Sequence, residues 1–70
     1  MQTQVKVWID VKKMRTGRGW LQREAAEKLG ITRAHLSAVE NRKRNISMKL
    51  MTAIIKVFDV TYNDFVIKDE

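Results

Sequence analysis

Cysteine and proline are absent from the 70 residues, and glycine occurs only three times. Without cysteine, the chain can form no disulfide, no thiolate metal site and no cysteine nucleophile. The single histidine, His35, cannot build a multi-histidine metal site, so we expect no metal and no cofactor. Because proline is absent and glycine is rare, the composition favours an all-α chain.

Long apolar runs are missing as well. No segment approaches the roughly 18 consecutive apolar residues of a membrane-spanning helix, and the N-terminus lacks a basic start followed by an apolar stretch. We therefore expect no membrane span, no secretory signal and a cytoplasmic location. Residues 1–70 are enough for a single domain, with no room for a ligand-binding domain or an enclosed active site. We expect no small-molecule ligand and no enzymatic activity.

The charge is unevenly distributed along the chain. The formal net charge is +6, with thirteen basic and four acidic residues in positions 1–58 and an acidic excess in positions 59–70. A basic body with an acidic end is typical of a protein that binds a polyanion from one side. The alternative is a basic protein with no such partner.

Turn and capping residues divide the chain into five segments with helical periodicity. Val7, Val11 and Met14 recur at helical spacing in the first segment, although partial alternation over Val5–Ile9 leaves a strand as the weaker alternative. Thr32 and Ser47 are good N-caps, and Thr61 with Asp64 resembles a capping box. The predicted helices are Val5–Thr16, Leu21–Leu29, one starting at Thr32, one starting at Ser47, and Thr61 to about Ile67.

The predicted core combines apolar positions from all these segments. The fourth segment contributes Met48, Met51, Ile54, Ile55 and Phe58, and Trp20 is expected to pack with them. A core of this size is not expected to bury every remaining apolar residue. The residues in excess are Val5, Trp8, Ile9, Leu50, Val57, Tyr62, Val66 and Ile67.

The two helices between about Gln22 and Asn41 have the pattern of a helix-turn-helix motif. Ala26 is a small residue at the point where the second helix crosses the first, and Gly30 can adopt the positive φ of the turn. Ala25, Leu29, Ile31, Leu36 and Val39 anchor the pair to the core. The outer face of the second helix is then free to enter a DNA major groove about 12 Å wide.

The run LQREAAEKLGITRAHLSAVENRKRNISMKLMTAIIKVFDVTYNDF resembles the phage-repressor, or Cro-like, helix-turn-helix family. The resemblance covers about Val7 to Val66 and rests on Gln22, Ala26, Gly30, Leu36, Val39 and the segment Glu40–Lys43. It implies a lambda-repressor-like fold of five short helices around one core. It also implies sequence-specific binding of double-stranded DNA by a nucleoid-associated transcriptional regulator, most often a repressor of a phage, plasmid or restriction-modification system.

The resemblance also implies roles for individual residues. Base contacts are expected from Arg33, Ala34, Ser37, Ala38 and Thr32, with Arg33 best suited to bond guanine O6 and N7 together. Phosphate contacts are expected from Gln22, Asn41, Lys43, Arg44 and Arg42. Arg15 and Glu40 match a structural pair that joins the first helix to the end of the recognition helix.

Three residues depart from the family pattern. Leu21 occupies a position where Ser or Thr usually caps the helix, so that helix start is expected to be frayed or shifted. Arg42 replaces a frequent glycine, so we expect either a left-handed Asn41 or a longer helix. Asp59 replaces the glycine that commonly ends the fourth helix.

Family members form dimers, which implies a homodimer that reads an inverted repeat with recognition helices about 34 Å apart. The expected interface comprises Tyr62, Phe65, Val66 and Ile67, partly buried within the subunit and partly across the two-fold axis. The alternative function is an antitoxin or regulatory subunit that acts mainly through protein contact. A basic membrane-surface peptide fits less well, since the apolar positions suit packed helices better than one interfacial helix.

Overall fold

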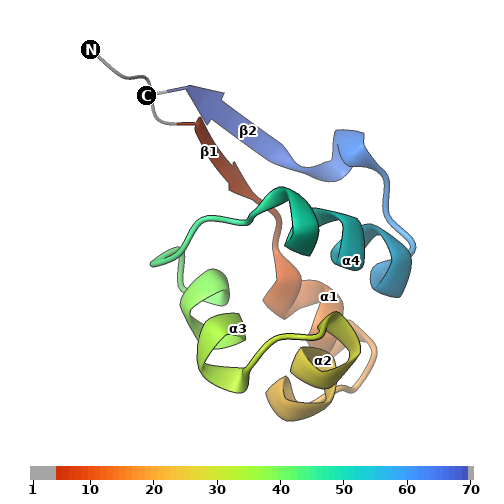
Figure 1. Cartoon of the computed structure of the whole chain (residues 1–70). Coiled ribbons are helices and arrows are strands. Elements are labelled where there is room, and N and C mark those ends of the chain that lie inside the picture. Colours follow the sequence, from red (N-terminus) through yellow and green to blue (C-terminus); the bar gives the residue numbers. More distant parts are fainter. Residues whose placement is uncertain (1–4, 70) are drawn as a thin grey trace.

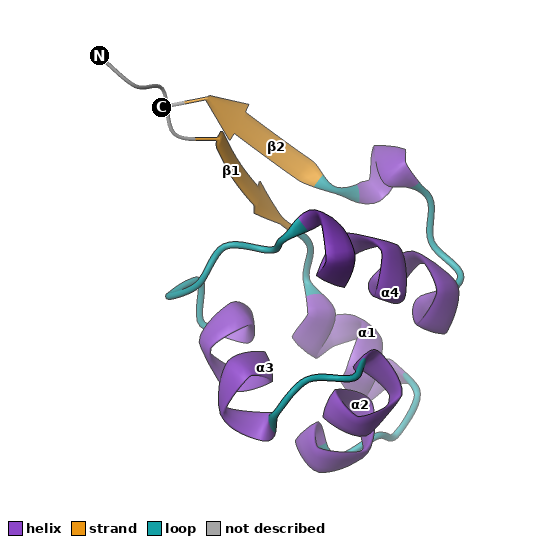
Figure 2. Cartoon of the chain, viewed as in Figure 1, coloured by secondary structure: helices purple, strands orange, loops and turns teal. Residues whose placement is uncertain are grey.

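The computed structural model describes residues 5–69, which form four α-helices, a 3-10 turn and a two-stranded antiparallel sheet. In Figure 1 the two strands lie side by side and extend away from the helices, and Figure 2 separates the two kinds of structure by colour. The expectation of an all-α fold with five helices is therefore wrong. The elements in chain order are β1 (Val5–Trp8), α1 (Val11–Gly17), α2 (Gln22–Leu29), α3 (Arg33–Glu40), α4 (Met48–Phe58), η1 (Tyr62–Asp64) and β2 (Val66–Asp69).

The first predicted helix divides into strand β1 and a shorter helix. Asp10 caps α1, and its carboxylate accepts a hydrogen bond from the Lys13 backbone amide at 3.1 Å. The residues before this cap include the partial alternation of apolar and polar side chains over Val5–Ile9, and the strand that it left as the weaker alternative forms over Val5–Trp8. A four-residue strand has no internal hydrogen bonds, so β1 depends on a partner elsewhere in the chain.

Strand β2 supplies that partner from the other end of the described chain. Val5 pairs with Asp69 and Trp8 with Val66 in an antiparallel register. The capping interaction at Thr61 does occur, with the Asp64 carboxylate accepting from the Thr61 amide at 2.8 Å, but it starts only the 3-10 turn η1. Phe65 is already extended, and β-branched Val66 and Ile67 suit a strand. The predicted helix from Thr61 to Ile67 is therefore wrong beyond its first turn.

Helices α2, α3 and α4 begin and end close to the predicted positions. Thr32 accepts a hydrogen bond from the His35 amide at 3.0 Å, and Ser47 accepts one from the Leu50 amide at 3.1 Å. These caps satisfy amides that have no partner within the helix. Leu21 cannot cap with its own side chain, and instead its amide donates to the Glu24 carboxylate at 3.0 Å. The start of α2 is therefore well defined despite the missing hydroxyl.

One apolar core joins the four helices with Ile9 and Phe65, the residues next to the inner ends of the two strands. Its largest fully buried side chains are Leu36, Ile54, Val11 and Val39. The predicted core position of Met48 is wrong, since this side chain is 72% exposed. Of the apolar residues in excess, Ile9 and Leu50 are buried, at 7% and 4% exposed, whereas Val5, Tyr62, Val66 and Ile67 remain exposed. Trp20 packs against the core as predicted, with its ring centroid 5.4 Å from that of Phe58.

A residue in the left-handed conformation follows each of the four helices, beginning with Gly19 after α1 at a φ of 72°. Gly30 ends α2 with a φ of 73°, as predicted. After α3 it is Arg42, with a φ of 59°, and not Asn41, that adopts this conformation. Asp59 ends α4 with a φ of 55°. Residues other than glycine are disfavoured in this conformation because their Cβ atom comes too close to the following carbonyl oxygen.

Replacing Asp59 with glycine is expected to stabilise the protein by about 0.5–1 kcal/mol, since it removes both an unfavourable φ and a negative charge at a helix C-terminus. Asp59→Asn removes only the charge and is expected to give a smaller gain. Urea denaturation of the three proteins separates the two effects. A loss of stability in Asp59→Gly would contradict this account.

Candidate DNA interface

The exposed face of α3 carries the residues predicted to contact bases. Arg33 and Ala34 are exposed near its N-terminus, and Ser37 and Ala38 follow one turn later, half-buried. Residues three and four apart lie on the same helix face, so these four side chains form one surface. Leu36 and Val39 lie on the opposite face and are both 0% exposed. The core therefore fixes which face of α3 is available to a ligand.

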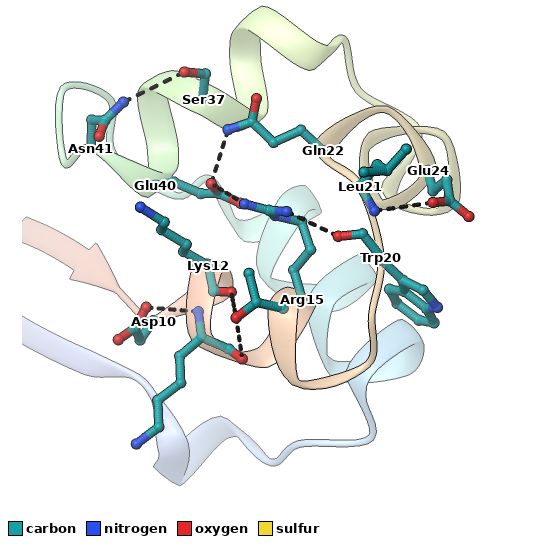
Figure 3. A network of polar contacts seen from close by, with 12 residues as sticks. Asp10, Lys12, Arg15, Trp20, Leu21, Gln22, Glu24, Ser37, Glu40 and Asn41 are labelled. Atoms are coloured by element: carbon teal, nitrogen blue, oxygen red, sulfur yellow. Dashed lines mark hydrogen bonds and ion pairs between the residues drawn. The ribbon is translucent and has the colours of Figure 1, made fainter.

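Thr32 lies at the N-terminal end of this surface. Its hydroxyl oxygen accepts from the His35 amide, so the hydroxyl can still donate its hydrogen to a ligand. Further along α3, the Ser37 hydroxyl oxygen lies 3.5 Å from the side-chain nitrogen Nδ2 of Asn41, a long contact (Figure 3).

The opposite side of α3 is joined to α1 and α2 through the carboxylate of Glu40. The guanidinium of Arg15, in α1, donates to both carboxylate oxygens, from Nε at 2.8 Å and from Nη2 at 3.1 Å. Nη1 of Arg15 donates to the Trp20 carbonyl at 2.9 Å. Figure 3 shows this arrangement, in which α1, the α1–α2 loop and the end of α3 meet at one ion pair. The side chains of Arg15 and Glu40 are only 10% and 2% exposed.

Gln22, at the start of α2, completes this network. Its Nε2 donates to Glu40 Oε1 at 3.0 Å, which braces α2 against the end of α3. An amide NH₂ has two hydrogens, so the second can still donate to a phosphate oxygen. The side chain is half-buried, so one residue can both brace α3 and make the expected phosphate contact.

The α3–α4 loop holds the residues predicted to contact phosphates. Asn41, Arg42, Lys43 and Arg44 are all exposed. The loop is tied to α3 by its backbone, since the Lys43 amide donates to the Ala38 carbonyl at 2.8 Å. The structure thus places these four residues next to the end of the recognition helix.

Two residues that sequence reasoning left without a role connect this loop to β1. The Trp8 indole nitrogen donates to the Val39 carbonyl at 3.2 Å, and the Arg42 guanidinium lies 3.7 Å from the Trp8 ring centroid. The Asn45 side chain accepts from the Val7 amide at 2.6 Å and donates to the Val5 carbonyl at 2.7 Å. Asn45 thus binds the outer edge of β1 as a neighbouring strand would. No local pattern indicates these contacts, because the partners lie 31 to 40 residues apart.

The four residues expected at a dimer interface do not share one environment. Tyr62, Val66 and Ile67 are 54%, 48% and 42% exposed, whereas Phe65 is 7% exposed and belongs to the core of its own subunit. Val66 and Ile67 lie on strand β2 instead of on a helix. Three of the four are therefore available at the surface.

A family model for the Cro/C1-type helix-turn-helix matches residues 11–65, which is most of the chain. The chain belongs to this helix-turn-helix family. The family consists of DNA-binding transcription regulators and is not typically enzymatic. Comparison with curated proteins found no significant match. Within residues 5–69, no helix has the length and apolar character needed to cross a membrane.

The Arg15–Glu40 pair provides a test of how this helix-turn-helix domain is held together. Glu40→Ala is expected to lower the free energy of unfolding by about 3–5 kcal/mol, because it leaves the Arg15 charge buried without a partner. The double variant Arg15→Met with Glu40→Leu removes both charges and is expected to lose much less stability. Urea denaturation measures both, and a loss below about 1 kcal/mol in the single variant would contradict a structural role for the pair.

Proposed function

We propose that this helix-turn-helix regulator is a repressor that binds an inverted repeat as a homodimer, with α3 in the major groove of each half-site. The observation that carries the proposal is the outward face of α3, on which Arg33 has only small neighbours, Ala34, Ser37 and Ala38. Small side chains allow the helix backbone to approach base edges closely. Arg33 can then reach guanine O6 and N7 together.

In this proposal Arg33, Ala34, Ser37, Ala38 and Thr32 contact bases. Ala34 and Ala38 offer only apolar contact, for example with a thymine methyl group, and Ser37 discriminates weakly because its hydroxyl can donate or accept. Gly30 supports the arrangement, since its left-handed conformation gives the turn that precedes α3.

Gln22, Asn41, Arg42, Lys43 and Arg44 contact phosphates and orient the helix without reading sequence. Arg42 stacks on Trp8 through the face of its guanidinium, which leaves the N–H groups at the edge for a phosphate. The net charge of +6 supports this assignment, because phosphate neutralisation supplies most of the non-specific affinity for DNA.

The homodimer is proposed to form through the exposed side chains of Tyr62 and Ile67, with Phe65 supporting them from the core. Val66, also expected at this interface, is exposed on the opposite face of β2, where it lies beside Trp8. A two-fold axis there would place two α3 helices on successive turns of one DNA face, about 34 Å apart. The protein would act in the cytoplasm, at the nucleoid or on phage or plasmid DNA.

A selection of bound duplexes from a random pool tests the proposal. We expect an enriched inverted repeat whose half-sites are about one helical turn apart. Enrichment of no sequence would contradict sequence-specific binding, and a single half-site would contradict the two-fold dimer.

The second candidate is an antitoxin or regulatory subunit for which DNA is secondary. It is favoured by the same exposed apolar residues, Tyr62, Val66 and Ile67. A stoichiometric partner in the purified complex, together with duplex binding no tighter than about 10⁻⁶ M, would support it over the repressor.

Arg33→Ala is expected to weaken binding of the selected site by about 1–3 kcal/mol and to remove the preference at one base position in each half-site. Arg33→Lys keeps the positive charge but cannot form the bidentate hydrogen bonds to guanine. We therefore expect this variant to keep its affinity for random DNA and to lose the preference at that base position. Titration of duplexes mutated at each position measures both. An unchanged base preference in both variants would show that Arg33 does not read the site.

Lys43→Ala is expected to weaken all duplexes nearly equally and to reduce the slope of log affinity against log salt by about one unit, as one phosphate contact is lost. Lys56→Ala, an exposed lysine on α4 away from the loop, serves as the control and should leave the slope unchanged. A change confined to one base position would instead assign Lys43 to base recognition.

A further inference from the structure

The sheet and the α3–α4 loop enclose a groove rich in positive charge. We refer to strands β1 and β2 together as the ribbon. The groove has a volume of about 870 Å³, and five of its lining residues are cations: Lys6 and Lys68 from the ribbon, and Arg42, Lys43 and Arg44 from the loop. Among the described residues that line it, none is acidic. Such a surface suits a polyanion.

The two ribbon lysines lie directly opposite each other, as a cross-strand pair. Paired residues project from the same face of a sheet, and like charges in this position destabilise the strands. Trp8 and Val66, two pairs further along the ladder, project from the same face, whereas Val7 and Ile67 between them project from the other. Because Arg42 stacks on the Trp8 ring, this face of the ribbon is turned toward the loop.

The position of the ribbon relative to α3 is fixed by short contacts. Asn45 holds the β1 backbone through Val5 and Val7, and the indole of Trp8 donates to Val39, the next-to-last residue of α3. The lysines of the ribbon are therefore held in a constant relation to the recognition helix.

We propose that the ribbon is a second DNA-binding element, which contacts the phosphate backbone flanking the site read by α3. This inference rests on the proposed function, in which the same loop already contacts phosphates. A strand of DNA backbone held by Lys43 and Arg44 borders the groove, and Lys68 and Lys6 extend the cationic surface along it. A second copy of the chain is a poorer occupant, since it would bring the same positive charges to this face.

The test compares Lys68→Gln with a matched control, Lys56→Gln, on two duplexes that contain the selected site. One duplex carries about one helical turn of flanking DNA on each side, and the other ends with the site. On the flanked duplex, Lys68→Gln is expected to reduce the slope of log affinity against log salt by about 0.9. The ratio of wild-type to variant affinity should therefore fall about threefold between roughly 50 and 200 mM salt. On the trimmed duplex, wild type and variant should bind alike, and Lys56→Gln should match wild type on both.

A second variant, Lys68→Glu, separates DNA contact from folding. It places a negative charge opposite Lys6, which is expected to stabilise the ribbon while repelling phosphate. We expect a thermal midpoint no lower than that of wild type, together with weaker binding of the flanked duplex than Lys68→Gln shows. Weaker binding that accompanies a lower thermal midpoint in both variants would overturn the inference.

The remaining outcomes distinguish the inference from the proposed function. If Arg33→Ala weakens binding and Lys68→Gln leaves the slope on the flanked duplex unchanged, the inference fails and the proposed function stands. If the wild type prefers no sequence, the proposed function fails, and a reduced slope for Lys68→Gln on random duplexes would still support contact between the ribbon and DNA. A shift only in the dimer dissociation constant, measured by sedimentation, would assign the ribbon to a protein interface and overturn the inference.

Discussion

The buried ion pair between Arg15 and Glu40 is the interaction on which the arrangement of the helices depends. A carboxylate that is 2% exposed needs a counter-charge and further hydrogen bonds, and Arg15 and Gln22 supply them from α1 and α2. Such pairs add little net stability, because desolvation offsets much of the attraction. The effect of this pair is on geometry, because Arg15 and Gln22 can both donate to Glu40 only when α1 and α2 lie beside the end of α3. In that placement Leu36 and Val39 face the core, and Arg33 faces outward.

The contacts that follow α3 extend this rigidity to the ribbon. The recognition helix ends at Glu40, and Arg42 reverses the chain with a left-handed backbone while its guanidinium covers Trp8. Trp8 is bonded to the end of α3, and Asn45 is bonded to β1. A two-stranded sheet is marginal in isolation, so these contacts explain how so short a ribbon persists. The loop cations are consequently positioned from both sides, by α3 and by β1.

The exposed surfaces divide into two chemically different parts. The face of α3, the loop and one face of the ribbon carry Arg33, Arg42, Lys43, Arg44 and Lys68, which suit a polyanion. Tyr62 and Ile67 are apolar side chains that remain exposed elsewhere on η1 and β2, which suits a protein partner. Membership of a family of DNA-binding regulators agrees with the first part, and a two-fold dimer would use the second.

Most of the helical fold was predictable from local patterns, because caps and apolar periodicity act over three or four residues. Thr32, Ser47 and Gly30 illustrate this, and the helix-turn-helix followed from them. The ribbon was not predictable from local patterns, since the pairing of Val5 with Asp69 is a contact between opposite ends of the chain. For the same reason the roles of Trp8, Asn45 and Lys68 emerged only from the folded structure. Local sequence thus determined α2, α3, α4 and the outward face of α3. Tertiary contacts decided where the strands replace the expected helices and which distant cations share a groove.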